Sequence, residues 1–198
     1  MRGPMLSAMI DRYWNDHHGS KLDDYLDWYR NLKCLPFLTE LDRNRAAIIF
    51  AVVGVCGKIH DHQHRVGKET LTEAAAVFLG HMNEIVVSKK FAELHAIIEK
   101  HAIKGFGVLA IYDTSLRLGA FLGLAPETVY LHAGAKTGFE RLRPHLDTSM
   151  RVVDRMDLPP ALQELRLDHV ENFLCIFKDT FADLEKIPEP CVHDRGIC

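Results

Sequence analysis

The chain has 198 residues, of which 47% are hydrophobic and 26% charged, and its 24 lysines and arginines against 27 acidic residues give a formal charge of −3. A chain of this length buries roughly 70% of the surface that its unfolded form exposes, and the composition excludes intrinsic disorder and collagen-like or coiled-coil folds. The near-neutral charge excludes a protein that coats nucleic acid or an anionic membrane with its whole surface.

The predicted elements begin with two amphipathic helices in the first 33 residues, separated at residues 18–20. The longest apolar run, residues 46–56, is too short to span a membrane, which needs about 20 residues. It predicts a helix that is buried on all sides, with Thr39 as its N-cap, and that runs to about Lys58. We therefore expect no membrane contact.

The polar segment at residues 59–68 predicts a loop, and Thr70 with Glu73 predicts a capping box that opens the next helix. Apolar spacing then predicts a helix over about residues 88–101 and another from Leu109 to Gly123. Further helical stretches follow, and the only short strand candidate is at residues 128–131.

These patterns predict an all-α fold: a compact multi-helix domain of about 8–10 helices over residues 1–187, with a loosely ordered tail at residues 188–198. The five cysteines are odd in number and form no C-x-x-C pair, and no apolar secretion signal opens the chain. These features favour a reducing, cytoplasmic location.

The connection between the helices at about 88–101 and 109–123 carries Gly105 and Gly107 on either side of Phe106. Glycine adopts the positive φ that a tight turn needs, and we expect Phe106 to anchor the turn in the core. The uncovered N–H groups at the N-terminus of the second helix, together with its dipole, form a site for an anion such as a phosphate. A tight turn without a ligand is the alternative.

Five residues of this connection, Ile103, Gly105, Phe106, Gly107 and Ala110, match the pattern of the helix-hairpin-helix family, which the chain resembles over roughly residues 88–122. In that family the hairpin amides grip a DNA phosphate, which positions the protein without reading the base sequence. The resemblance implies that double-stranded DNA is the partner.

The charges along the chain favour the same interpretation. Residues 86–143 carry eight lysines and arginines against five acidic residues, a balance of +3, whereas the rest of the chain has 16 basic and 22 acidic residues, a balance of −6. Such asymmetry is typical of one DNA-contacting face on an acidic body, although a solvated charged face is the alternative. The predicted DNA-binding residues are Lys100, Lys104, Gly105, Phe106, Gly107, Arg117 and Lys136.

An all-α chain with one such hairpin resembles in particular the helix-hairpin-helix DNA glycosylases, which flip a nucleotide out of the duplex and cut its N-glycosidic bond. Bifunctional members carry a catalytic lysine at the position that Leu109 occupies here. The resemblance therefore implies a monofunctional hydrolase that leaves an abasic site, acts as a monomer and needs no cofactor. Its substrate would be a damaged base in repair, or a modified base of foreign DNA in antiviral defence.

The transition state of this reaction carries positive charge on the sugar, so a carboxylate is needed. The family's catalytic aspartate has no counterpart among residues 126–134, and the candidates are Asp113, which Arg117 at i+4 would keep ionised, and Glu127. His132 is a candidate proton donor or phosphate ligand. A structural ion pair for Asp113 and an interior position for His132 are the alternatives.

Aromatic residues supply two candidate base pockets. Tyr112 and Tyr130 are predicted to line the pocket beside the catalytic candidates. A second aromatic set in the first two helices could stack on a base, or could pack between those helices; it consists of Trp14, Tyr25, Trp28 and Tyr29.

Two weaker patterns concern metals. His60, His62 and His64 alternate along one segment, but no partner at fixed spacing is visible, and we expect a solvated loop there. Cys191, His193 and Cys198 could contribute zinc ligands from the tail. No metal ion is expected.

Two rival functions remain: a non-catalytic helix-hairpin-helix module that holds DNA for a partner, and a helical interaction protein in which the hairpin is only a turn.

Overall fold

The computed structural model describes residues 3–55, 58–143 and 151–184, and most of these residues are helical, as the all-α prediction requires. The helices of the described residues are α1 (Gly3–Asn15), α2 (His18–Leu32), α3 (Glu40–Val52), α4 (Lys68–Gly80), α5 (Met82–Val86), α6 (Phe91–Lys100), α7 (Val108–Leu122), α8 (Ala133–Leu142), α9 (Pro160–Gln163) and α10 (Leu167–Leu184). None of them is long and apolar enough to cross a membrane.

Short elements complete the described part of the chain. Two antiparallel strand pairs are formed by β1 (Gly54–Val55) with β2 (Lys58–Ile59) and by β3 (Val129–Tyr130) with β4 (Val152–Val153), and two 3-10 helices are η1 (Asp61–Arg65) and η2 (Arg155–Asp157). The strand predicted at residues 128–131 is thus confirmed as β3.

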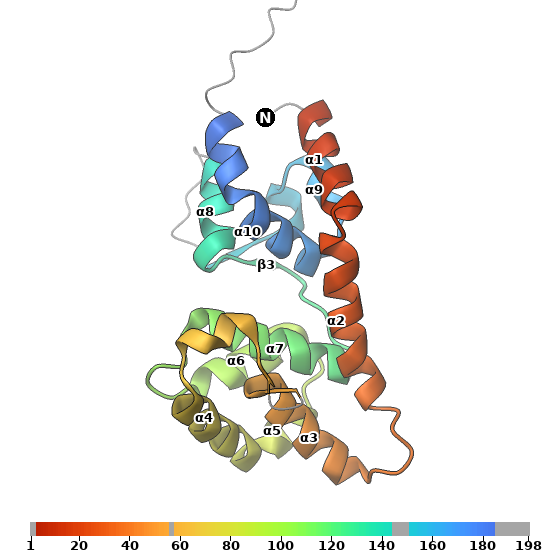
Figure 1. Cartoon of the computed structure of the whole chain (residues 1–198), viewed down its shortest axis with the longest axis vertical. Coiled ribbons are helices and arrows are strands. Elements are labelled where there is room, and N and C mark those ends of the chain that lie inside the picture. Colours follow the sequence, from red (N-terminus) through yellow and green to blue (C-terminus); the bar gives the residue numbers. More distant parts are fainter. Residues whose placement is uncertain (1–2, 56–57, 144–150, 185–198) are drawn as a thin grey trace, which may run out of the picture.

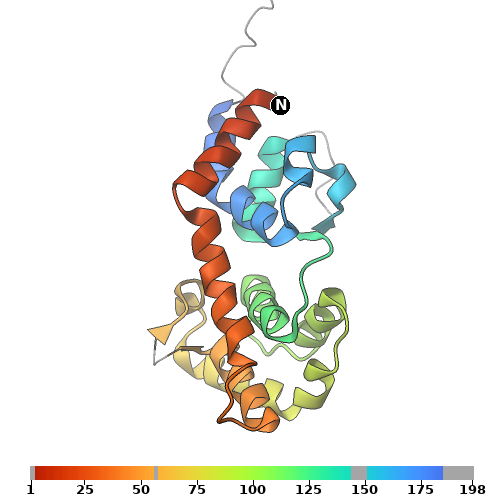
Figure 2. The same ribbon diagram turned by 90° about the vertical axis from the view of Figure 1, so that its right-hand side faces the viewer.

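The buried hydrophobic side chains form two clusters, and the chain folds into two lobes around them (Figure 1). The first lobe contains α2 to α7, and the second contains α1, α8, α9 and α10 with the β3–β4 pair. The column formed by α1 and α2 runs along one side of both lobes (Figure 2). The prediction of a single domain over residues 1–187 stays a prediction, and the tail at residues 188–198 lies outside the described residues.

Several predicted boundaries agree with the structure and others do not. Thr39 caps α3, since its hydroxyl accepts a hydrogen bond from the backbone N–H of Asp42. However, α3 ends at Val52 instead of Lys58, and Ile49 is 40% exposed, so this helix is not buried on all sides. The predicted capping box is also wrong, because α4 begins at Lys68 and Thr70 lies inside the helix.

The helix that is buried on every side is α7, whose residues from Ala110 to Phe121 are all buried. It packs against α2, α3 and α6, so it forms the centre of the first lobe. It ends at Gly123, which adopts a left-handed φ of 81° and whose N–H closes the last turn. The predicted helix from Leu109 to Gly123 is therefore confirmed.

The connection between α6 and α7 shows why its glycines differ. Gly105 has a φ of 91°, which favours glycine, whereas Gly107 has a φ of −75° and needs no glycine for conformational reasons, in contrast to the sequence prediction. Phe106 is 3% exposed and its ring packs edge-on against Phe78, so the predicted anchoring of the turn is confirmed.

In the second lobe, α8 and α10 pack closely because small residues face the longer helix. A side chain at Gly138 would come within 2.1 Å of the backbone oxygen of Leu174, and one at Gly134 would clash with the sulfur of Cys175. This contact fixes the position of α10, and the buried Glu171 of this helix lies at the boundary with the first lobe.

Candidate functional site

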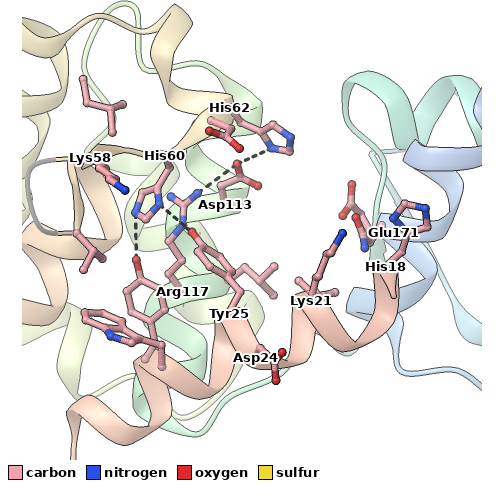
Figure 3. A pocket seen from close by; sticks show the side chains of 18 of the residues that line it. His18, Lys21, Asp24, Tyr25, Lys58, His60, His62, Asp113, Arg117 and Glu171 are labelled. Atoms are coloured by element: carbon pink, nitrogen blue, oxygen red, sulfur yellow. Dashed lines mark hydrogen bonds and ion pairs between the residues drawn. The ribbon is translucent and has the colours of Figure 1, made fainter. Parts of the chain in front are cut away.

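A cavity of about 900 Å³ lies where the two lobes meet, within the range of about 300–1,000 Å³ that is usual for ligand pockets (Figure 3). It is lined by α2, by the segment around β1, β2 and η1, by α7 and by α10. Its polar and aromatic side chains are His18, Lys21, Asp24, Tyr25, Trp28, Tyr29, Lys58, His60, Asp61, His62, Asp113, Arg117, Glu171 and Asn172.

Asp113 lies on the first-lobe wall, in the middle of the buried helix α7. Burial alone would raise the pKa of this carboxyl, but a hydrogen bond from His62 and the positive charge of Arg117 hold the pKa below its usual 3.8. One carboxylate oxygen lies 3.1 Å from His62 Nδ1 and 3.5 Å from an Arg117 guanidinium nitrogen. Asp113 is therefore ionised at neutral pH while only 9% of the residue is exposed.

The guanidinium of Arg117 is fixed from three sides. It pairs with Asp113, donates a 2.8 Å hydrogen bond to the backbone oxygen of Ala51, and donates another to the hydroxyl of Tyr25. Since Arg117 is 4% exposed, it is not part of an exposed DNA-contacting face. Any phosphate that it contacts has to enter the cavity.

Glu171 lies on the opposite wall, on α10 of the second lobe (Figure 3). Burial, followed by the negative charges of Asp113 and Asp168, raises the pKa of Glu171 well above its usual 4.5. The Nε2 atom of His132 lies 3.4 Å from a carboxyl oxygen of Glu171. Burial lowers the pKa of His132 to about 4, so His132 is neutral at neutral pH and this contact is not an ion pair.

The histidine segment that the sequence predicted as a solvated loop contains β2 and η1 and packs against α7. His62 contacts Asp113, and the side-chain amide of Gln63 donates a 3.4 Å hydrogen bond to Thr114. The hydrogen bond to Asp113 is the main reason that the pKa of His62 is raised. Asp113 and Thr114, two polar residues of the otherwise apolar α7, therefore contact η1.

His60 connects the same segment to the aromatic side of the cavity. Its two ring nitrogens lie 3.0 Å from the hydroxyls of Tyr25 and Tyr29, and its Nε2 lies 2.8 Å from the backbone oxygen of Phe50. Burial and the positive charge of Arg117 lower the pKa of His60 to about 4. This neutral histidine orients tyrosines and is not available as a metal ligand while it makes these contacts.

The aromatic set of the first two helices is divided by the structure. Tyr25, Trp28 and Tyr29 line the cavity, whereas Trp14 packs against His169, with ring centroids 5.0 Å apart. Trp28 is 39% exposed, so its ring can accept a stacking partner. The stacking surface is therefore on α2.

The other predicted catalytic and base-pocket residues do not line the cavity. Glu127 is exposed in the segment between α7 and β3. Tyr112 is 1% exposed, its ring lies 5.5 Å from that of Tyr130 and 4.5 Å from that of His132, and its hydroxyl has no hydrogen-bond partner. His132 contacts the cavity wall only through Glu171.

The predicted DNA-binding lysines are spread over three elements. Lys104 is exposed in the connection between α6 and α7, whereas Lys100 on α6 lies 3.7 Å from Glu84. Lys136 lies on α8 in the second lobe, 3.9 Å from Glu140. Among the hairpin residues, Gly105 and Gly107 are exposed and Phe106 is buried. Only Lys104 and the two glycines thus form an exposed local group.

Sequence reasoning missed Glu171 and the role of His62. Glu171 had a detectable signal, because it stands four residues after Leu167 and three before Leu174, on the apolar stripe of an amphipathic helix. His62 had no such signal, since nothing local shows that η1 packs against α7.

No protein-family model, curated protein or solved structure matches the chain.

Proposed function

We propose that the chain is a monofunctional DNA glycosylase, which hydrolyses the N-glycosidic bond of a damaged or modified nucleotide held in the cavity between the lobes. The observation that carries the proposal is the pair of carboxyl groups on facing walls, with the pKa of Asp113 lowered and that of Glu171 raised. Two carboxyl groups with opposite protonation states are the usual arrangement for acid–base chemistry at one bond.

The two groups have complementary roles in this reaction. The ionised Asp113 stabilises the positive charge that develops on the sugar and orients the attacking water. The protonated Glu171 donates its proton to the departing base. The hydroxyl group of the water bonds to the sugar carbon as the bond from that carbon to the base nitrogen breaks. The remaining proton of the water returns to Glu171, so the products are the free base and an abasic site.

The remaining lining residues favour a nucleotide over a neutral sugar. Tyr25 and Trp28 supply aromatic surface for a base, and Lys21 and Lys58 supply positive charge for phosphate oxygens. A target nucleotide in a duplex reaches such a cavity only after it has been flipped out of the stack.

We further infer that α6, the connection and α7 form the helix-hairpin-helix that holds the DNA backbone. The positive φ of Gly105, the buried Phe106 and the start of a 15-residue helix at Val108 support this inference. Asp113 lies six positions after Gly107, which is roughly 9 Å along the axis of α7. A phosphate at the hairpin would therefore be bound near the reacting sugar.

The test is release of free bases from duplex DNA, with unmodified DNA and genomic DNA that contains natural modified bases as parallel substrates. Mass spectrometry identifies the released base, and cleavage of abasic sites by alkali measures its amount. We expect Asp113→Asn to reduce the single-turnover rate about 10³-fold, within the usual contribution of a positioned carboxylate. Asp27→Asn, which removes an exposed carboxylate of α2, is the matched control and should keep the rate.

A non-catalytic DNA-binding module is the second candidate, because the exposed group at the hairpin does not depend on the cavity. That function predicts salt-sensitive retention of duplex DNA with no base released from any substrate. A chain that neither binds DNA at low salt nor releases a base has neither function.

A further inference from the structure

A second group of ionisable side chains lies in the first lobe, outside the cavity. It consists of His81 between α4 and α5, Glu84 on α5, and His101 directly after α6. One carboxylate oxygen of Glu84 lies 3.1 Å from His81 Nδ1, and the other lies 3.4 Å from His101 Nε2. The potential ligand atoms of all three residues lie within 4.8 Å of one another, which no other three histidine, cysteine or acidic residues achieve in the described ranges.

These distances match the coordination of zinc. Zn²⁺ binds histidine nitrogens and carboxylate oxygens at about 2.0–2.2 Å in tetrahedral geometry, which places neighbouring ligand atoms roughly 3.3 Å apart. The two imidazole rings are stacked, with centroids 3.5 Å apart and planes 20° from parallel, and each has a nitrogen beside the same carboxylate. Because a metal ion binds a histidine nitrogen in the plane of its ring, the rings have to turn out of this stack to reach one ion.

We propose that His81, Glu84 and His101 bind a Zn²⁺ ion, with water in the fourth position. Two histidines and one glutamate are a known ligand set for zinc, which uses three protein ligands where a position stays open. The side chain of Glu84 is 47% exposed and that of His81 is 36% exposed, so an ion can reach the group from solvent. The proposal does not depend on the glycosylase function.

The surrounding charges and helix ends are compatible with a cation. His81 follows the last residue of α4 and His101 follows the last residue of α6, and the C-terminus of a helix carries the negative end of its dipole. Lys100 Nζ lies 3.7 Å from Glu84 and competes with the ion for this carboxylate. Its side chain is 67% exposed, so it can move into solvent when zinc binds.

The place of the site in the fold indicates what the ion does. His101 is the residue at which α6 ends and the connection to α7 begins, while His81 and Glu84 hold the α4–α5 junction. Zinc would therefore link the start of the α6–α7 connection, which contains Gly105 and Gly107, to the junction of α4 and α5. We expect the bound ion to stabilise the first lobe, while its fourth position stays open to water.

The experiment measures zinc bound to the purified full-length chain, without an affinity tag, after dialysis against a trace of chelator. We expect about one zinc ion per chain and a higher thermal midpoint with zinc than without it. Loss of a group that only orients a zinc ligand costs about 10–100-fold in affinity, so His81→Ala and His101→Ala should weaken binding by at least about 100-fold. Cobalt(II), added in place of zinc, should give the visible absorption of a tetrahedral site in wild type only.

Three control variants distinguish this site from the others in the chain. Lys100→Ala removes the competing cation and should retain or tighten binding, His64→Ala removes an exposed histidine of η1, and a Cys191→Ser/Cys198→Ser double variant removes the tail thiols. The His64→Ala variant and the double cysteine variant should both keep the zinc ion. If a histidine variant does not fold, Glu84→Gln, which keeps the shape of the side chain, takes its place. The proposal is overturned if wild type binds clearly less than one equivalent, or if binding is lost in the His64 or cysteine variants instead.

Discussion

The two walls of the cavity carry the same functional group in opposite electrostatic surroundings. On the first-lobe wall, Asp113 has two nitrogen partners, and both lower its pKa. On the second-lobe wall, Glu171 lies 3.4 Å from the neutral His132, and two other carboxylates raise its pKa further. Both residues are largely buried, at 9% and 8% exposure, so burial does not explain the difference.

This comparison shows that neighbouring side chains decide the direction in which the pKa of each carboxyl group moves, and in the proposed reaction they thereby set the roles of acid and base. Burial disfavours the charged form of both carboxyl groups, and the cations around Asp113 outweigh that cost. Because the ionised Asp113 itself raises the pKa of Glu171, the two groups titrate as a coupled pair. A substitution that changes the charge of one carboxyl residue should therefore change the pKa of the other.

Replacement of Arg117 by methionine should have the largest effect, because it makes the surroundings of Asp113 similar to those of Glu171. Breaking a buried ion pair costs about 3–5 kcal/mol, and this variant also leaves the backbone oxygen of Ala51 with only the longer, 3.5 Å hydrogen bond from the Thr114 hydroxyl among the described residues. We expect a loss of that size in the free energy of unfolding at pH 7, measured with urea. Arg30→Met, which removes an exposed arginine of α2, should change it little.

At low pH the loss caused by Arg117→Met should shrink, since Asp113 is then protonated in both proteins. A variant whose stability equals that of wild type at pH 7 would show that the pair contributes nothing, and the electrostatic difference between the walls would have another source.

Glu171→Gln should have the next largest effect, with opposite signs for activity and stability. Loss of the proton donor should reduce base release about 100-fold. The pKa of Glu171 is raised in the folded chain, so wild type loses stability as pH rises above the usual 4.5, because unfolding releases the carboxyl to ionise freely. The amide cannot ionise, so the variant should equal wild type near pH 4 and exceed it at pH 8.

The pH profile of base release tests the same pair in wild type. The rate should fall at acidic pH as Asp113 becomes protonated, and it should fall again as pH rises through the raised pKa of Glu171 and this group loses its proton. In Glu171→Gln the second fall should disappear. A variant that keeps the full rate and the second fall assigns the proton donor to another residue.

The contrast between the walls also shows which features the sequence could predict. Asp113 and its partner Arg117 were accessible because they are four residues apart on one helix, and the helix itself follows from its apolar spacing. The turn with Gly105 and Phe106 was accessible for the same reason, since a buried aromatic residue beside a glycine with positive φ is a local feature.

The features that sequence analysis missed depend on contacts between distant segments. His62 reaches Asp113 across 51 residues of chain, and Glu171 faces the cavity only because α10 packs against α8 in the other lobe. The end of α3 at Val52 was also missed, because the apolar run continues into β1, where tertiary packing and not periodicity decides the conformation.

His62→Ala should have a smaller effect, because it removes one of the two partners of Asp113 and leaves Arg117. The pKa of Asp113 should rise, so the acidic limb of the rate profile should move to higher pH, and the rate on that limb should fall about tenfold for a rise of one pKa unit while the rate at pH 7 changes little. The folded-state pKa of His62 is itself raised, so its contribution to stability is present below its usual 6.5 and is lost as pH rises through the folded value.

Two measurements check this variant. Thermal unfolding at pH 5.5 and pH 8 should show greater destabilisation at the lower pH, and the rate profile should be compared with that of His64→Ala, an exposed neighbour in η1. An unchanged acidic limb in His62→Ala would mean that Arg117 alone keeps Asp113 ionised.

Lys104→Ala should have the smallest effect, and it tests the hairpin independently of the two cavity walls. If Lys104 contacts one phosphate, its loss should weaken DNA binding a few-fold and reduce the slope of log K against log salt by about 0.9. The single-turnover rate at saturating DNA should not change, because the residue lies outside the cavity. Lys33→Ala, another exposed lysine at the end of α2, is the control and should keep the wild-type slope. An unchanged slope in Lys104→Ala would place the DNA backbone elsewhere and reduce the hairpin to a structural turn, while the pairing of Asp113 with Glu171 would stand or fall on base release alone.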